Sequence, residues 1–376
     1  MKKCCFFIGT DRHNDEIVII RQAQVLKDAG YEVVYVVSDD ECDDERGGIT
    51  IKPSGYRAKG YFSRIFITPL KLYKKLRDVN ADIYQTCSVD QIITCLLLRK
   101  RNKKIIFHLR EGHPYTFYQK SHLPLFIKRL FVKMMEIWMR FALKKFDAVI
   151  AVTEDISKYL KKWGVKKLYI EGNFPIYQHN HSFSYDDYLK RSNTIIYYGT
   201  IYEISRQEVF LDSLSGIDNV RYLLAGRFKG HNQYERTIKS HKMWNIVEFI
   251  DGFDYNELFS LQSRAVISNV LRDFSKTSSP NGSLGIIKVF ESMEAGLPLI
   301  CSDVQLYRDI MKEYKCGILV DPNDSKQINK AIKYLLENKK EAYLMGQEGR
   351  RAVKEKYSWN IQAKEYVDII NHFFDK

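Results

Sequence analysis

The sequence predicts an α/β protein with two Rossmann-like domains that face each other across a cleft. Three observations support this prediction: a length of 376 residues, an alternation of short apolar runs with helical patterns, and a restart of that alternation after residue 192. A chain of this length usually has more than one hydrophobic core. Alternating strands and helices indicate parallel sheets with helices on both faces. Ligands of such domains bind at the carboxyl ends of the strands.

The first half of the chain starts with a strand and continues in strand–helix units. The first apolar run, KCCFFIG, ends at Gly9 and indicates a buried strand. A helix should follow, because Ile19, Ala23 and Leu26 recur at helical spacing and Gly30 then ends the pattern. Further strands are expected at 33–37, 83–84, 105–109 and 148–152.

A polar, turn-prone stretch separates the two halves of the chain. It contains Pro175 and reads as an interdomain linker. Beyond it, strands are expected at 194–198, 222–225, 247–250, 265–268, 297–301 and 317–320. The predicted organisation is an N-terminal domain (1–175), a linker (176–192), a C-terminal domain (193–355) and a final helix (356–376).

Composition excludes several classes of protein. With 45% hydrophobic and 28% charged residues, the chain is neither disordered nor collagen-like. Its seven cysteines show no zinc-ligand spacing, which favours reduced thiols in a cytosolic protein. No apolar run approaches the 18 residues of a membrane span. The acidic run DDECDDER at 39–46 is expected to be a solvated loop and not a metal site.

Positive charge is concentrated in the first half. Residues 52–146 contain 21 basic and 5 acidic residues, a net charge of +16. Such a surface suits anionic lipid, nucleic acid or phosphorylated substrates, and it can equally be a solvated lysine-rich face. Nucleic acid is disfavoured because no recognised binding module is present. An anionic membrane surface stays open as a partner of residues 52–146.

An amphipathic helix is expected at 126–145 within this basic region. One side carries basic residues and another carries large apolar ones. The basic residues are Arg129, Lys133, Arg140 and Lys144, and the apolar ones are Ile127, Phe131, Met134, Trp138 and Phe141. The apolar stripe is expected to pack in the core. Because the surrounding residues are strongly basic, contact of this region with a membrane surface is as well supported as a merely solvated basic face.

The most informative stretch is 280–301, PNGSLGIIKVFESMEAGLPLIC. A loop with Gly282 and Gly285 precedes a helix whose apolar stripe leaves Glu291 off the buried face. Gly296 ends that helix. A glycine loop before a helix start presents backbone N–H groups and a positive dipole end, which suit a diphosphate.

KVFESMEAGLPLICSD, followed by CGILVDPND at 316–324, resembles the nucleotide-sugar end of retaining GT-B glycosyltransferases of family 4. The resemblance implies that the Glu291 carboxylate accepts hydrogen bonds from ribose hydroxyls. The first glutamate of the family's Glu-x7-Glu motif falls on Ser283, a departure from the family pattern. Lys288 with Glu291 fits a Lys-x-x-Glu variant. The other nucleotide-sugar-binding residues implied here are Gly285, Ile286 and Ile287.

Residues 197–214 resemble the start of the family's C-terminal domain. There a glycine ends the first strand and a cation grips the donor diphosphate, which gains charge as the glycosidic bond breaks. Gly199 and Thr200 match, and the cation falls on Ser205 in the simplest alignment or on Arg206 one residue later. The segments 222–228 and 247–258 also match and add Gly226, Arg227 and Phe253 to the implied nucleotide-sugar-binding residues.

The N-terminal domain resembles the family too. Gly9 ends its first strand and is one of the nucleotide-sugar-binding residues that the resemblance implies. IIFHLREGHP at 105–114 matches a family segment whose glutamate falls on Glu111. The family's histidine near the donor sugar falls on Arg110, so His108, Arg110, His113 or none of them takes its role. A lone histidine is more often structural. Residues 357–374 resemble the family's last helix, which crosses back to the first domain.

These observations predict a metal-independent hexosyltransferase that moves a sugar from a UDP- or GDP-linked donor to a hydroxyl of a glycan. The resemblance implies retention of anomeric configuration, acceptor binding by the first domain, and no cofactor. The proposed catalytic residues are Glu291, Arg206, Lys288, Ser283, Glu111 and His108. We expect a lipid-linked acceptor, a role in capsule or O-antigen polysaccharide synthesis, and a cytoplasmic enzyme bound peripherally to the membrane.

Two alternatives remain open at this point. A nucleotide-sugar epimerase has the same fold and converts its donor without an acceptor. A degenerate glycosyltransferase would bind nucleotide or glycan without transfer, and Ser283 and Arg110 favour it. A dehydrogenase is disfavoured because no GxGxxG follows the first strand.

Overall fold

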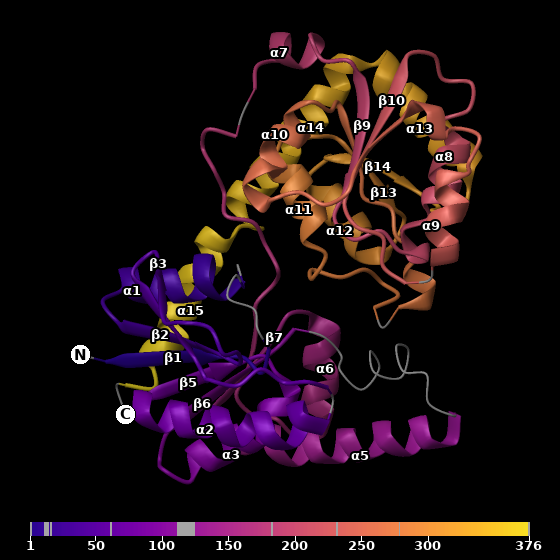
Figure 1. Ribbon diagram of the computed structural model, residues 1–376. Helices are drawn as coiled ribbons and strands as arrows, with labels where there is room; N and C mark the ends of the chain where they lie inside the picture. The colour runs from indigo at the N-terminus through magenta and orange to yellow at the C-terminus, as the bar shows by residue number, and fades with distance from the viewer. Residues whose placement is uncertain are drawn as a thin grey trace. The chain divides into compact units, whose positions relative to one another are not determined.

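The computed structural model describes residues 2–10, 15, 17–60, 62–110, 125–181, 183–230, 232–277 and 279–374. Its contacts divide the chain into two compact units. The first unit comprises residues 1–172 and 360–376, and the second unit comprises residues 173–359. Each unit is a β-sheet flanked by helices, so the prediction of two α/β units with parallel sheets is confirmed (Figure 1). Two of the predicted site residues, Glu111 and His113, lie outside the described residues.

The sheet of the first unit has eight strands in the described residues, in the order β3-β4-β2-β1-β5-β6-β7-β8. They are β1 (Lys3–Phe7), β2 (Glu32–Val37), β3 (Asp44–Arg46), β4 (Ile49–Pro53), β5 (Ile83–Thr86), β6 (Lys104–Leu109), β7 (Ala148–Ala151) and β8 (Leu168–Ile170). All neighbours pair in parallel except β3 and β4. Strand order reverses beside β1, which lies between β2 and β5. The carboxyl end of β1 is therefore the expected ligand-binding edge.

Helices cover both faces of this sheet. They are η1 (Ile17–Ala23), α1 (Gln24–Asp28), η2 (Ser63–Ile67), α2 (Thr68–Val79), η3 (Val89–Gln91), α3 (Ile92–Arg99), α5 (Leu125–Leu143), α6 (Glu154–Trp163) and α15 (Trp359–Asn371). On one face α2, α3 and α5 lie side by side and share a core with the strands (Figure 1). That core contains Leu72, Cys95 and Met139. From α15, Tyr366 donates a hydrogen bond to Gln85 of β5, 2.8 Å, so the last helix packs on the first unit.

The second unit has six parallel strands in the described residues, in the order β11-β10-β9-β12-β13-β14. They are β9 (Asn193–Tyr198), β10 (Val220–Ala225), β11 (Val247–Ile250), β12 (Ile267–Asn269), β13 (Leu299–Ser302) and β14 (Gly317–Val320). Its helices are α7 (Tyr185–Leu189), η4 (Glu203–Ser205), α8 (Gln207–Ser213), α9 (Asn232–Lys239), η5 (Trp244–Ile246), η6 (Tyr255–Glu257), α10 (Leu258–Ser263), η7 (Phe274–Lys276), α11 (Ile287–Glu294), α12 (Gln305–Glu313), α13 (Ser325–Glu337) and α14 (Lys339–Glu355). Strand order reverses between β9 and β12, which makes the carboxyl end of β9 the expected ligand edge.

Four local expectations differ from the structure. Within the acidic run, Asp44–Arg46 forms β3, because antiparallel pairing with β4 satisfies its backbone. The helix expected around Ile19 is π-helical over Ile17–Ala23 before it becomes α-helical. Residues 185–189, expected in the linker, form α7, because Tyr188 is buried in the core of the second unit. Strands β4 and β8 were not predicted at all.

A fifth difference concerns α5, whose apolar stripe was expected in the core. The stripe is exposed: Phe131 is 40%, Met134 59% and Phe141 50% accessible. Only Met139, Ala142 and Leu143 of this helix are buried. The helix therefore anchors itself to the first unit by its last turn, and most of its apolar surface faces outward.

Candidate functional site

Three glycines end consecutive strands of the second unit. Gly199, Gly226 and Gly252 follow β9, β10 and β11 with φ angles of 92°, 152° and 79°, which disfavour any side chain. The N–H of Gly199 donates to Ala225 O at 2.9 Å and that of Gly226 donates to Ile250 O at 2.8 Å. A Cβ on Gly226 would lie 1.8 Å from Gly199 O. Bare backbone therefore forms this edge of the sheet, where a ligand can approach closely.

Helix α11 begins beside this edge. The loop before it is fixed by Ser283, whose Oγ accepts the N–H of Gly285 at 3.0 Å, and by Asn173, whose N–H donates to Leu284 O at 3.1 Å. The residue preceding the helix, Ile286, provides no side-chain cap. The first-turn N–H groups at Ile287 and Lys288 have no acceptor within the helix. They are available to an anion.

Lys288 joins the first turn of α11 to the end of β9. Its Nζ lies 3.8 Å from the centre of the Tyr197 ring. A Cβ placed on Gly199 would lie 3.8 Å from the same Nζ. The predicted residues Gly199, Lys288 and Ile287 are thus brought together, and a cation stands over the carboxyl end of the central strand.

Glu291 lies one turn further along α11 and is only 6% exposed. That exposure excludes a solvated helix glutamate. The hydroxyl of Tyr198 donates to Lys288 O at 2.8 Å and lies 3.0 Å from Ser292 Oγ, while Gln262 Nε2 donates to Glu291 O at 3.3 Å. Burial, with the adjacent Glu291 carboxylate adding to it, raises the pKa of Tyr198 well above its usual range. The neutral Tyr198 hydroxyl therefore holds α11 in register with β9.

Arg206 is the cation at the start of α8. Its φ of 51° is left-handed, and its Nη1 lies 2.8 Å from Glu208 Oε1. Its Nε is buried and has no hydrogen-bond partner among the described residues. The alternative position, Ser205, is occupied locally: its Oγ donates to Tyr202 O at 2.5 Å. Arg206 rather than Ser205 therefore supplies positive charge in this segment.

The other predicted residues of the second unit lie along the same strand ends. Thr200 O accepts a hydrogen bond from the Tyr197 hydroxyl at 2.9 Å. Arg227 is exposed beside Gly252, where an added Cβ would lie 2.7 Å from its Nε. Phe253 is half-buried against the cluster that contains Ile196 and Tyr198.

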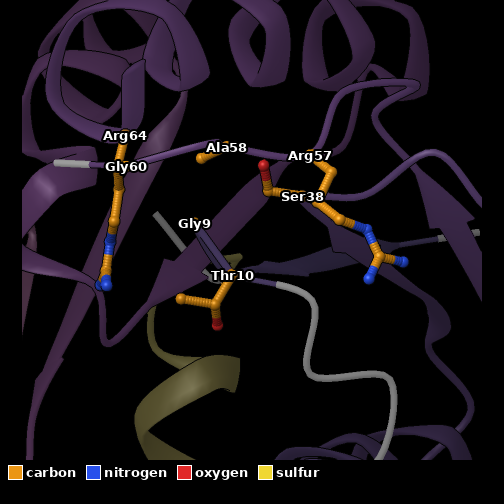
Figure 2. Close-up of a pocket in the computed structure, with 7 residues that line it drawn as sticks. All are labelled: Gly9, Thr10, Ser38, Arg57, Ala58, Gly60 and Arg64. Carbon is orange, nitrogen blue, oxygen red and sulfur yellow. The ribbon is translucent and has the colours of Figure 1, made fainter. Parts of the chain in front are cut away.

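In the first unit, Gly9 lines a pocket of about 340 Å³ at the ends of β1 and β2 (Figure 2). His108, by contrast, is 2% exposed inside the unit. Burial, with the positive charge of Arg110 adding to it, lowers the pKa of His108 well below its usual range. Arg110 donates from Nη1 to both oxygens of Asp15 at 3.1 and 2.8 Å. His108 is thus a neutral core histidine.

A buried polar network surrounds His108 and was not predicted. Gln22 Nε2 lies 3.2 Å from His108 Nδ1 and donates to Glu171 Oε1 at 2.7 Å. Gln85 Nε2 donates to Gln22 Oε1 at 2.9 Å, and Tyr366 of α15 completes the network through Gln85. Burial raises the pKa of Glu171 to about 7. The network ties four elements of the first unit and the residue after β8 together.

Two kinds of feature are absent from the described residues. No three His, Cys, Asp or Glu side chains in this part of the chain are placed to hold a metal ion. None of the described helices is long and apolar enough to cross a membrane.

Comparison with known proteins assigns each unit to a family. Residues 187–352 match the family described as Glycosyl transferases group 1, and residues 16–171 match the family described as Glycosyltransferase Family 4. A phosphatidyl-myo-inositol mannosyltransferase from Mycobacterium leprae (strain TN) is 27% identical over 192 residues. That alignment covers 48% of this chain and 47% of the relative, so it spans about half the length of each.

Solved structures resemble the whole chain. Sucrose-phosphate synthase from Thermosynechococcus elongatus has a TM-score of 0.75 at 16% identity and covers 100% of both chains. Anabaena HepE in complex with UDP-glucose has a TM-score of 0.74 at 12% identity, covering 99% of this chain and 100% of that chain. These likenesses establish the fold. With one family match in each unit, the chain belongs to the group 1, family 4 glycosyltransferases and has their GT-B fold.

Proposed function

We propose that this protein transfers a hexose from a nucleotide-sugar to a hydroxyl of a lipid-linked glycan, with retention of configuration. The observation that carries the proposal is the second-unit edge. There a buried carboxylate, Glu291, lies one turn after the uncapped N–H groups of α11, and Lys288 stands beside the bare backbone at Gly199. A nucleoside diphosphate offers matching chemistry, because it has a pair of ribose hydroxyls and a negatively charged diphosphate.

The residues of this edge have different roles in the proposed reaction. The Glu291 carboxylate accepts hydrogen bonds from the two ribose hydroxyls and so fixes the position of the nucleoside. The first-turn N–H groups of α11, Lys288 and Arg206 hold the diphosphate and stabilise the charge it gains as the glycosidic bond breaks. These groups supply the positive charge that a metal supplies in other transferases, so the proposed reaction is metal-independent. Ser283, in the place of the family's first glutamate, shapes the loop by binding Gly285.

The proposed acceptor and location rest on the first unit. The face formed by α2, α3 and α5 exposes large apolar side chains among basic ones, as a surface bound to an anionic bilayer does. The Mycobacterium leprae relative is named for a phospholipid acceptor, which agrees in chemical class. We therefore place the enzyme on the cytoplasmic face of a membrane, in the synthesis of a cell-surface polysaccharide such as capsule or O-antigen.

A donor screen tests the proposal. The purified protein is incubated with labelled UDP-glucose and GDP-mannose, with a lipid extract as acceptor and with EDTA present throughout. Transfer of label to lipid from one donor, lost in Glu291→Ala, is the expected result. Binding of a donor without turnover would favour a degenerate binding protein. Conversion of the donor without an acceptor would favour an epimerase, and no binding of any donor would contradict the site.

A further inference from the structure

Arg272 lies at the ligand edge of the second unit and was not predicted as a site residue. It follows β12, the strand that pairs with β9 where the strand order reverses. Strand β13 pairs with the other side of β12. In a parallel sheet the carboxyl ends of neighbouring strands meet at the same edge, about 5 Å apart. Arg272 therefore shares an edge with Gly199, which follows β9.

The backbone of Arg272 is fixed by its neighbours at this edge. Its N–H donates to Ser302 Oγ at 2.8 Å, and the Ser302 hydroxyl donates back to Arg272 O at 2.8 Å. Ser302 ends β13 and is fully buried. The next residue, Asp273, donates from its N–H to Ile204 O at 2.7 Å, which ties the segment to η4. The backbone alone holds this segment, so the Arg272 side chain is available for another role.

The side chain of Arg272 lacks the acceptors that a guanidinium group needs. It is half-buried, and its Nε is buried without a hydrogen-bond partner in the described part of the chain. It forms no ion pair with a described residue, although Asp273 is adjacent. The Asp273 Oδ1 accepts instead from the N–H and the hydroxyl of Ser275, at 3.1 and 2.5 Å. A cation in this state is costly unless a ligand or water supplies its acceptors.

The strand order indicates which part of a donor lies beside Arg272. In the proposed complex the ribose is at Glu291, and the diphosphate is at Lys288 beside the end of β9. Glu291 is joined to α10, whose Gln262 donates to Glu291 O at 3.3 Å and whose apolar side packs on β10. Strand β12 lies on the other side of β9 from β10. Because the diphosphate separates ribose from sugar, the sugar falls at the end of β12, where Arg272 is.

The loop before α11 adds no carboxylate to this end of the site. Ser283 is neutral and occupies the place of the family's first glutamate. Two contacts connect this loop to the segment of Arg272. The Tyr307 hydroxyl donates to Ser283 O at 3.5 Å, and the Tyr307 ring lies 5.8 Å from the ring of Phe274, centroid to centroid. The Arg272 guanidinium carbon lies 5.9 Å from the centre of the same Phe274 ring.

The charges at the ends of β12 and β13 favour an anionic group on the sugar. Asp303, which follows β13, pairs with Arg308 at 2.5 Å and so leaves the charge of Arg272 uncompensated. The proposed diphosphate already meets Lys288 and the first N–H groups of α11. Sugar hydroxyls would supply acceptors to Arg272 but no charge. A carboxylate supplies both, because its two oxygens match two parallel N–H groups of a guanidinium.

We propose that the donor is a nucleotide-linked hexuronic acid and that Arg272 binds the carboxylate of its sugar. The neutral Ser283 favours the same donor, since a glutamate at this position would repel a sugar carboxylate. This inference rests on the proposed transfer and names its substrate class: the transferred sugar carries a carboxylate at C6.

Titration calorimetry at pH 7.5 compares donors that differ only at C6 of the sugar. The pairs are UDP-glucose with UDP-glucuronic acid and GDP-mannose with GDP-mannuronic acid, and UDP and GDP alone are the references. The wild-type chain should bind the uronic acid about tenfold more tightly than the hexose of the same nucleotide. Arg272→Gln should remove this preference and leave affinity for the nucleotide and the hexose unchanged. Binding of the nucleotide alone also reports that the variant is folded.

Three further variants sharpen the test. Arg272→Lys keeps the charge but loses the guanidinium fork, so it should retain only part of the preference. Ser283→Glu should weaken binding of the uronic acid several-fold more than binding of the hexose, because it adds a like charge. Arg221→Gln is the matched control: Arg221 is exposed near the amino end of β10, at the opposite edge of the same sheet, and its loss should change no affinity.

The outcomes separate this inference from the proposed transfer. Wild-type binding of a hexose donor without any preference for the uronic acid would overturn the inference and leave the transfer standing. An equal loss of affinity for nucleotide, hexose and uronic acid in Arg272→Gln would place Arg272 at the diphosphate and overturn its assignment to the sugar. Failure of all six compounds to bind would contradict the nucleotide edge, and this inference with it.

Discussion

The carboxyl edges of the two sheets are built by different means. In the second unit, Gly199, Gly226 and Gly252 place bare backbone at successive strand ends, and α11 starts directly beside them. In the first unit, the π-helical η1 follows the equivalent edge and a buried side-chain network supports it. The second unit thus presents backbone at its ligand edge, which suits the diphosphate of the proposed donor, whereas the first unit presents side chains at its edge.

The largest loss of stability is expected for Gly226→Ala. The added Cβ would lie 1.8 Å from Gly199 O at a φ of 152°, so the loss of stability should be about 3 kcal/mol or more. Gly230→Ala is the matched control, because Gly230 also has a positive φ, 111°, but no atom lies within 4 Å of its Cβ position. That variant should lose only about 1 kcal/mol. Calorimetric unfolding measures both, and equal losses would contradict the close approach of the two loops.

The buried network of the first unit should make the free energy of unfolding depend on pH. Burial raises the pKa of Glu171 from an ordinary 4.5 to about 7, so the folded protein binds a proton that the unfolded chain releases between these values. The free energy of unfolding therefore falls as pH rises from 4.5 to 7, because this carboxyl ionises more readily in the unfolded chain. The glutamine of Glu171→Gln stays neutral, so the free energy of unfolding of this variant should rise relative to the wild type across that window. The difference should reach about 3 kcal/mol at pH 7.5.

Denaturation of both proteins from pH 4.5 to 8 measures this gain. The difference between the two proteins is the relevant quantity, since the lowered pKa of His108 gives the wild-type curve an opposing slope below pH 6.5. Glu45→Gln, a change at an exposed glutamate of β3, is the control and should show no gain that grows with pH. A constant offset between wild type and Glu171→Gln would contradict the assignment of Glu171.

A smaller effect should distinguish the register of α11 from general packing. Tyr198→Phe removes a buried hydroxyl that bonds Lys288 O and Ser292, and should cost about 1–2 kcal/mol and weaken donor binding several-fold. Tyr188→Phe removes another buried hydroxyl of the second unit, bonded to Val266 O at 2.9 Å. It should cost similar stability and leave donor binding unchanged. Calorimetric unfolding and donor titration measure the two effects, and equal losses of donor affinity would contradict the role of Tyr198.

The sequence predicted the apolar, central elements of both units better than the polar elements of the first unit. The strands of both sheets that are apolar and central were predicted within a few residues, and so was α11, because local periodicity and glycine positions determine them. The edge strand β3 was missed, since its residues are polar and only pairing with β4 orders them. The polar network of the first unit could not be predicted for a similar reason. Its hydrogen bonds join residues that are 86, 149 and 281 positions apart in the sequence.

Helix α5 shows the limit of reading periodicity alone. Its amphipathic pattern predicted a helix correctly, but the pattern does not say which medium the apolar side faces. Met139, Ala142 and Leu143 reach the core, whereas residues of the predicted apolar stripe such as Phe131, Met134 and Phe141 are 40–59% exposed. The excess of basic residues in 52–146 was the only sequence signal that pointed to another medium.

Titration calorimetry with UDP-glucose and GDP-mannose tests whether Glu291 binds the ribose of a nucleotide donor, as proposed. Glu291→Gln should weaken the preferred donor about 10- to 100-fold with little loss of stability. Glu294→Gln is the matched control on the same helix: Glu294 is 4% exposed and accepts the N–H of Gln178 at 3.0 Å, so its loss should lower stability and spare donor binding. Undiminished donor affinity in Glu291→Gln, or an equal loss in both variants, would contradict the account.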